Sequence, residues 1–434
     1  MIFRTLFAVF VAPLALTAQV RPPSASPPPG APTRTPVAAE PGSDLTVYLM
    51  TMGVGKEIWE QFGHNAIWFH VDRPASSGGP TDIVYNWGIF DFSQPNFIPR
   101  FLQGRMLYSM GGYSLESTME QYRQIDRSVW VQELDFTNQQ KVALRDFVLW
   151  NARPENANYY YDYFRDNCST RVRDALDRPL GGMLHATFSG RPTGHTYRWH
   201  TLRLTQSDRW LASGMDLGLG RPSDREISAY EEMFLPMRLQ EYVREIRVPG
   251  PDGTSRPLVK SERTLYESTR YREPSVPPRW TGPFLLIGLA LAALIAGAGW
   301  RAARGGRGAR LGAGVVFSLW SLVAGVLGLL LFLLWTVTHH TFAHRNENLL
   351  LVHPLWFALV VLAPLAAIRQ RDSTATRRLV YLFAALALVA PLLHLVGLSR
   401  QSNLEIIALT LPPILAMAWA VHHLTAHARR AARV

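Results

Sequence analysis

Cys168 is the only cysteine among the 434 residues, so it cannot form an intramolecular disulfide or belong to a multi-cysteine metal site. It lies in RDNCSTRVRDAL, where Asp166 or Asn167 is a suitable N-cap and apolar residues follow at helical spacing. A helix should therefore open at Cys168. Unpaired N–H groups and the positive end of the dipole in its first turn favour a nucleophilic thiolate. The alternative is a buried cysteine that only fills space.

A thiol nucleophile needs a base, and QFGHNAIWFHV offers two histidines. After Gly63 the pattern predicts a strand that opens at His64, whose ring can project past the sheet edge toward a helix N-terminus. His70 should share the same strand face and is the alternative base or an orienting partner. The third group of such a site is not evident, and Asn86 on the next predicted strand is the first choice for it. A structural histidine is the competing interpretation.

The first turn of the Cys168 helix also supplies the residues expected at the substrate, Ser169 and Asn167. The N–H groups of Cys168 and Ser169 should be unpaired there, and they are suited to stabilise an oxyanion. Three histidines farther along, in HATFSGRPTGHTYRWHTLR, match no metal-ligand spacing, and we expect a substrate-facing loop or plain surface. No metal or cofactor is predicted.

The chain divides by composition into four parts. Residues 1–18 have a short basic start, an apolar run and a small residue at the end, which is typical of a secretory signal peptide. A Pro-rich linker should follow over 19–43, then a mixed α+β domain over 44–278. Residues 279–434 should form an all-α membrane domain of about five transmembrane helices. The five apolar runs are Pro283–Trp300, Leu311–Val337, Pro354–Ile368, Leu379–Leu398 and Ile406–Leu424.

Arginine distribution orients these helices. The segments 301–310, 369–378 and 425–434 contain eleven arginines and one aspartate, nearly the whole formal net charge of +11. The opposite loops contain only Arg345 and Arg400 as fixed cations. By the positive-inside rule the arginine-rich segments are cytoplasmic, and the large domain lies on the other side of the membrane. The remaining chain is nearly neutral, so a nucleic-acid partner has no electrostatic support.

Several separated motifs together resemble one known family. They are GHNAIWFHVD, VYNWGIFDFSQPNFIPRFLQGRMLYSM, YYYDYFRDNCSTRVRDAL, GMDLGLGRPSDREISAYEEMFLPMRL and, in the membrane part, NENLLLVHP. A histidine that opens a strand before a cysteine that opens a helix is similar to circularly permuted papain-like (NlpC-like) proteins. The whole set resembles the Lnb family of bacterial lipoprotein N-acyltransferases, with a periplasmic domain joined to a membrane domain.

The resemblance implies a cysteine acyltransferase in the bacterial inner membrane. An acyl chain would pass from a phospholipid ester to Cys168 as a thioester, then to the N-terminal amine of a diacylglyceryl lipoprotein, with His64 as base. Two other functions remain open. The same pair could serve a membrane-tethered cell-wall amidase or peptidase, although such an enzyme needs at most one anchor. A non-catalytic membrane assembly protein would hold Cys168 as an inert, buried residue.

Overall fold

The computed structural model describes residues 40–72, 81–91, 93–250, 252–369 and 373–431. The predicted signal peptide, 1–18, and nearly all of the predicted linker, 19–43, lie outside the described residues. The described chain from Pro41 onward forms one compact unit, with an N-terminal sheet domain and a C-terminal helical region.

A seven-stranded sheet forms the centre of the N-terminal domain, and each hydrogen-bonded pair of neighbouring strands is antiparallel. Strands β1, β2 and β3 follow one another directly, so β2 lies at the middle of the sheet with a partner on each side. In spatial order the strands are β11 (Val259–Tyr266), β5 (Val129–Leu134), β1 (Leu45–Met52), β2 (His64–Val71), β3 (Asp82–Ile89), β4 (Leu107–Ser114) and β6 (Asn158–Tyr160).

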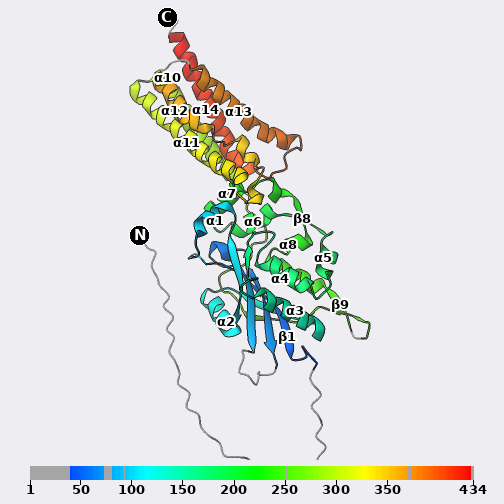
Figure 1. The fold of residues 1–434 in the computed structure, drawn as a ribbon. Helices are drawn as coiled ribbons and strands as arrows, with labels where there is room; N and C mark the ends of the chain where they lie inside the picture. The colour runs from blue at the N-terminus through cyan, green and yellow to red at the C-terminus, as the bar shows by residue number, and fades with distance from the viewer. Residues whose placement is uncertain (1–39, 73–80, 92, 251, 370–372, 432–434) are drawn as a thin grey trace, which may run out of the picture. The chain divides into compact units, whose positions relative to one another are not determined.

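The two faces of β2 bury different cores, because side chains alternate along a strand. Ile67 and Phe69 enter the main core, which α3 (Asn138–Asn151), α4 (Cys168–Asp177) and α9 (Pro236–Glu245) cover. Ala66 and Trp68 face a smaller core beneath α2 (Leu115–Gln124). Figure 1 shows α2 on one side of the sheet and α3 and α4 on the other. The predicted strand start at His64 and its alternation are confirmed.

Shorter elements complete this domain. The first is the 3-10 helix η1 (Ile58–Glu60), in the connection between β1 and β2. The others are α1 (Phe97–Gln103), α5 (Met183–Phe188), β7 (Pro192–Thr196), α6 (Tyr197–Thr205), α7 (Arg209–Gly218), η2 (Arg221–Asp224), β8 (Glu226–Ser228), α8 (Ala229–Glu232), β9 (Arg247–Pro249) and β10 (Ser255–Pro257).

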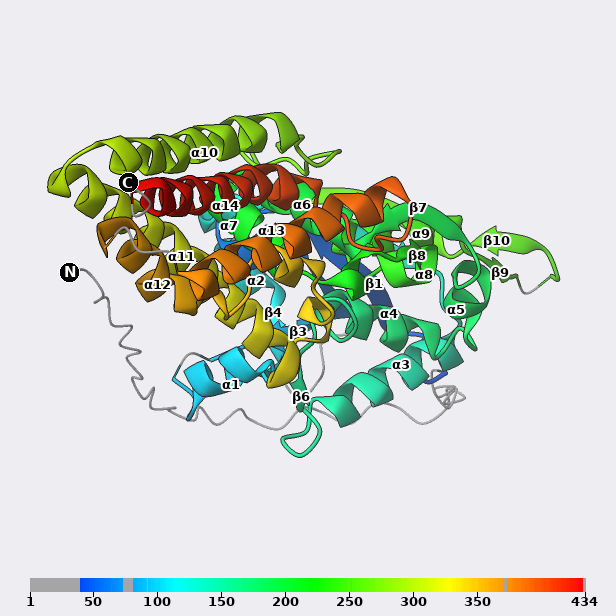
Figure 2. The same cartoon turned by 90° about the horizontal axis from the view of Figure 1, so that it is seen from above.

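The C-terminal region consists of five apolar helices. Of the described helices, four are long and apolar enough to cross a membrane: α10 (Thr281–Arg304), α11 (Arg307–Thr336), α13 (Thr374–Leu395) and α14 (Leu404–Ala431, apolar over Leu404–Ala426). Figure 2 shows α10 running along α14. The contact is close because a Cβ on Gly288 would lie 2.5 Å from the Ala408 carbonyl oxygen, and one on Gly299 would lie 2.5 Å from the Ala420 Cβ. Small residues of this kind permit close helix packing in a bilayer.

The fifth helix, α12 (Trp356–Arg369), has only 14 residues. It is therefore about 21 Å long, less than the ~30 Å apolar thickness of a bilayer. The loop before α12 and the loop after α13 nevertheless contact each other, so both lie on the same side of the membrane. Because α13 crosses between them, α12 must cross as well. Gln401 Oε1 accepts a hydrogen bond from the Glu347 N–H at 2.7 Å, and the Ser399 hydroxyl donates to Glu347 Oε2 at 2.7 Å. The predicted five spans thus correspond to four helices of full length and one short helix.

These same loops hold the helical region against the sheet domain, through η3 (Thr341–Ala343) and η4 (Glu347–Leu350). The Asn346 amide donates to the Leu217 carbonyl at the end of α7 at 2.8 Å. The Phe342 ring is fully buried, and its centre lies 4.6 Å from that of Phe164. Phe164 belongs to the segment that leads into α4, so the membrane loops support the helix that begins at Cys168.

Candidate active site

Helix α4 begins at Cys168 because Asn167 caps it. The Asn167 side-chain oxygen accepts a hydrogen bond from the Thr170 N–H at 2.9 Å, and the Thr170 hydroxyl accepts one from the Asn167 N–H at 2.8 Å. This reciprocal pair satisfies two backbone donors that a helix start would otherwise leave unpaired. Of the two predicted caps, Asp166 and Asn167, the structure uses Asn167.

The Cys168 thiol lies where several positive groups converge. Burial raises the pKa of the thiol, while the backbone N–H groups of Asn65, Ser169 and Cys168 itself, and the positive charge of Arg127, act in the opposite direction. Thiol is therefore the resting form, but any negative charge that develops on the sulfur meets oriented N–H dipoles. The Asn65 N–H also places this sulfur beside the residue that follows His64.

The His64 ring is oriented by Asn86. His64 Nε2 lies 3.0 Å from Asn86 Oδ1, and the Asn86 amide nitrogen donates to the Val84 carbonyl at 3.1 Å. Because the second bond fixes which end of the amide faces histidine, Asn86 offers an acceptor and Nε2 carries the proton. Nδ1 is then left with the lone pair of a base. Burial lowers the pKa of His64 to about 4, so the ring is neutral at ordinary pH.

A side-chain contact ties the start of β2 to the start of α4. The Ser169 hydroxyl lies 2.8 Å from Asn65 Oδ1 and 2.6 Å from the Met233 carbonyl oxygen, and the Asn65 amide donates to the Thr51 hydroxyl at 2.9 Å. Asn65 and Ser169 are both 0% exposed. Each directly follows a proposed reacting residue in the sequence, so this pair links the start of β2 at His64 to the start of α4 at Cys168.

The structure separates His70 from this group. His70 lies six residues along β2 from His64, about 20 Å away at the usual rise of a strand. Its Nδ1 lies 2.8 Å from Asp82 Oδ1, and its Nε2 lies 3.3 Å from Asp72. The expectation that His70 could replace or orient His64 is therefore wrong, since sharing a strand face does not bring two residues to the same end of it.

Asn167 and Ser169 are placed beside Cys168 as expected, but their side chains are already engaged. The Asn167 amide donates to the carbonyls of Tyr163 and Phe234 at 3.0 and 2.9 Å, in addition to its capping bond. A substrate would have to displace these bonds to reach the side chain. The expectation that the Asn167 side chain binds substrate is therefore wrong, and its role is structural. The Ser169 N–H does lie at the Cys168 sulfur.

A cavity of about 450 Å³ adjoins the histidine, and its lining includes Trp59, His64, Asn86, Gly88, Phe90 and Arg127. Gly88 has a left-handed backbone, with φ at +88°, and a Cβ there would lie 3.4 Å from the Cys168 Cβ. The absence of a side chain thus keeps β3 close to the thiol. Trp59 is 55% exposed and supplies an apolar edge to the cavity.

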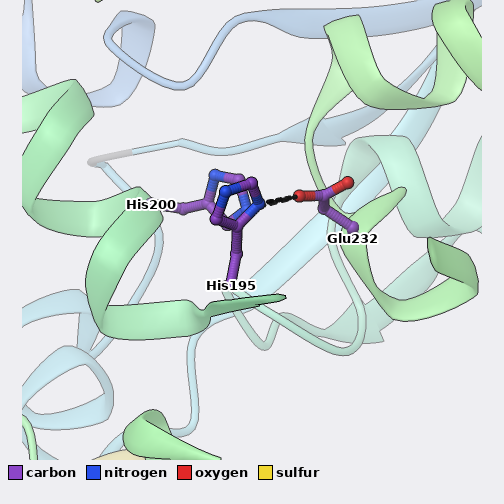
Figure 3. A group of neighbouring side chains, drawn as sticks. All are labelled: His195, His200 and Glu232. Carbon is purple, nitrogen blue, oxygen red and sulfur yellow. Dashed lines mark hydrogen bonds and ion pairs between the residues drawn. The ribbon is translucent and has the colours of Figure 1, made fainter. Parts of the chain in front are cut away.

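A second cluster contains His195, His200 and Glu232, drawn in Figure 3. The expectation of a substrate-facing loop or plain surface is wrong for His200, which is buried in α6, and both histidines lie beside a carboxylate. His195 Nδ1 and His200 Nε2 lie 3.0 and 2.8 Å from Glu232 Oε1, and His200 is 0% exposed. The Arg203 Nε donates to His200 Nδ1 at 3.1 Å, so His200 Nε2 carries a proton and offers no lone pair to a metal. The cluster is a hydrogen-bonded network that stabilises α6 and α8.

Arg127 is the site residue that sequence reasoning missed. It is 5% exposed, and its Nε donates to the Gly53 carbonyl at 2.9 Å. Its charge lowers the pKa of both Cys168 and His64. No local pattern marks Arg127, because it reaches the site from the end of α2 through tertiary packing.

The geometry defines a class: a sheet domain with a cysteine at a helix start and a histidine–asparagine pair nearby, continuous with a bundle of membrane-type helices. Comparison with known families identifies both parts of the chain. Residues 38–205 match the family model described as the Lnb N-terminal periplasmic domain, and residues 280–429 match that of the Lnb transmembrane domain. The chain belongs to the Lnb family and is a membrane protein with a periplasmic domain. No significant match was found among curated proteins or among solved structures.

Proposed function

We propose that this protein is a lipoprotein N-acyltransferase that uses Cys168 as its nucleophile. Membership of the Lnb family suggests lipoprotein N-acylation. The observation that carries the proposal is the Cys168 sulfur, with the N–H groups of Asn65 and Ser169 directed at it, at the end of β2 that carries His64 and its basic nitrogen. We further propose that the domain is a circularly permuted papain-like fold, because histidine on a strand precedes cysteine on a helix in the chain.

In the first step His64 Nδ1 takes the thiol proton, and the Cys168 sulfur attacks an ester carbonyl of a phospholipid. The N–H groups at the helix start stabilise the negative charge on the tetrahedral oxygen. The carbon–oxygen bond of the ester then breaks. The protonated His64 returns its proton to the departing alkoxide, which leaves a lysophospholipid and a thioester on Cys168.

In the second step the N-terminal amine of a diacylglyceryl lipoprotein attacks the thioester carbonyl. His64 accepts a proton from the amine, the carbon–sulfur bond breaks, and the thiolate recovers that proton. An amide and the free thiol result. A neutral histidine serves both steps, since a ring with a pKa of about 4 stays unprotonated until it takes the proton of the reacting group.

Helix α1 gives the site a route to the membrane. Its exposed side chains include Ile98, Phe101 and Leu102, which are 68%, 49% and 62% exposed at helical spacing. The Gln103 carbonyl accepts a hydrogen bond at 2.8 Å from the His339 N–H, just beyond the end of α11. An apolar helix face at the end of a membrane span suits the bilayer interface. Because α1 follows β3 and its Gly88, it would bring lipid near Cys168.

The test is intact-mass measurement of the full-length protein after incubation with phospholipid vesicles. The wild type should gain one acyl chain, and that chain should be lost on addition of a diacyl lipopeptide with a free amine. Cys168→Ser should gain none, because serine keeps the size and hydrogen bonding but has a far higher pKa than a thiol. Absence of acylation in the wild type, together with Cys168-dependent cleavage of cell-wall peptides, would refute the proposal in favour of an amidase.

A further inference from the structure

Five arginines line a second cavity, of about 790 Å³, that is not part of the Cys168 site. They come from four separate parts of the chain: the segment before α4, the region around η2, and two loops between membrane helices. Among the described residues, the lining is Arg165, Arg221, Pro222, Asp224, Arg225, Arg345 and Arg400. A cavity with this lining attracts anions.

Only two of the five guanidinium groups are balanced by carboxylates. Arg221 Nε lies 3.1 Å from Glu347 Oε1, and Arg225 is paired with Glu231. The one acid in the lining, Asp224, is engaged by the buried Arg198, whose Nε and a terminal nitrogen lie 2.8 and 3.0 Å from its two oxygens.

In the part of the chain that the structure describes, the guanidinium groups of Arg165, Arg345 and Arg400 form no ion pair with a carboxylate. All three are exposed. Three guanidinium groups without an ion-pair partner among the described residues thus face one cavity.

The position of the cavity narrows the choice of anion. Arg345 and Arg400 are the only Lys or Arg residues in the loops 338–353 and 399–405, and both line this cavity. Arg345 has φ at 53°, a left-handed backbone that costs a non-glycine residue about 1 kcal/mol or more. The cavity therefore lies at the outer ends of the membrane helices, where lipid phosphates are found.

A neighbouring cavity of about 510 Å³ makes a lipid a better fit than a free anion. It shares Arg221 and Arg345 with the arginine cavity, but its other lining includes the apolar side chains of Trp335, Leu349 and Leu350. Charged and apolar spaces thus adjoin, as the phosphate and the acylated glycerol of one lipid require.

We propose that these two cavities hold one glycerophospholipid, with its phosphate among Arg165, Arg345 and Arg400. Guanidinium groups bind phosphate oxygens through paired hydrogen bonds, which suits this composition. Arg165 precedes Cys168 by three residues, so their Cα atoms are at most about 11 Å apart. The site's role in presenting the donor ester to Cys168 rests on the proposed function, but lipid binding itself does not.

Binding is measured with the full-length Cys168→Ala protein in a non-ionic detergent, so that no turnover occurs. Isothermal titration uses three probes: dihexanoyl phosphatidylglycerol, dihexanoylglycerol, which has the same chains without phosphate, and sodium phosphate. The phospholipid should bind, dihexanoylglycerol should bind at least tenfold more weakly, and sodium phosphate should compete only at much higher concentration. Equal binding of dihexanoylglycerol, or full competition by phosphate at the same concentration, would overturn the lipid site.

The variants locate the site. Arg345→Gln with Arg400→Gln should weaken phospholipid binding at least tenfold, whereas Arg209→Gln, which removes an exposed charge from α7 outside both cavities, should leave it within twofold. If the double variant lacks a melting transition, Arg165→Gln replaces it with the same expected loss. Unchanged binding in a folded cavity variant refutes the inference even if Cys168 is acylated normally. Arginine-dependent binding without acylation of the active protein would instead refute only the proposed function.

Discussion

Replacement of Asn86 by aspartate should raise the acid limit of catalysis, which is the pH below which His64 is protonated and the rate falls. In the wild type, burial holds the pKa of His64 at about 4, and Asn86 contributes a neutral acceptor at 3.0 Å. A carboxylate there would favour the charged imidazolium. Two unit charges about 4 Å apart interact by about 4 kcal/mol at an effective dielectric constant of about 20. At 1.36 kcal/mol for each pKa unit, the shift is at most about 3 units.

The direction of the pH dependence follows from the protonation form of His64 that reacts. Only neutral His64 can accept the thiol proton, so the wild-type rate should be constant above about pH 5 and fall as pH drops through about 4. In Asn86→Asp the raised pKa means that the ring is already protonated near neutrality. The fall should then begin near pH 7. Asn86→Ala is the matched control, because it removes the orienting bond without adding charge and should lower the rate with no upward shift of the limit.

The assay is single-turnover formation of the Cys168 thioester, followed by intact mass from pH 4 to pH 9. Thermal unfolding at each pH separates loss of activity from loss of structure. An acid limit in Asn86→Asp within one unit of the wild-type value, in a folded protein, would show that His64 is not the base or that Asn86 does not face it.

Three further predictions concern positioning, stability and topology. Ser169→Ala should remove the single O–H donor that Asn65 Oδ1 and the Met233 carbonyl share, which should reduce stability by about 1–3 kcal/mol and slow thioester formation, as measured by thermal melts and intact mass. Normal values for both would refute the Asn65 contact as the link between strand and helix. Arg198→Met should lower the free energy of unfolding by about 3–5 kcal/mol in thermal melts, because the buried Arg198 is paired with two carboxylates at 2.8 Å. The control Arg145→Met removes an exposed charge and should change stability by less than about 1 kcal/mol. Equal effects of the two substitutions would contradict this reasoning. A reporter active only in the cytoplasm should work when fused after Val434 and not when inserted after Ser275, and the reverse pattern would contradict the outward orientation of the domain.

The sequence determined the features that depend on local pattern. The turn at Gly63 and the apolar run after it indicated the strand that opens at His64, and the Asn167 cap with the apolar spacing after it indicated the helix that opens at Cys168. Both signals act within a few residues, where backbone hydrogen bonding and burial leave little choice. The apolar runs and the arginine-rich loops likewise defined the membrane helices, since a bilayer imposes length and charge rules on any sequence.

Only the tertiary structure decided which of these residues meet. The sequence favoured His64 as the base and left His70, on the same strand face, as its alternative or orienting partner, but α4 packs at the end of β2 that carries His64 and leaves His70 with Asp82. Arg127 is far from both reacting residues in the chain and reaches them from the end of α2. The arginine cavity joins loops separated by more than two hundred residues. Such contacts are set by how the helices and the sheet pack together, and this packing depends on the whole core.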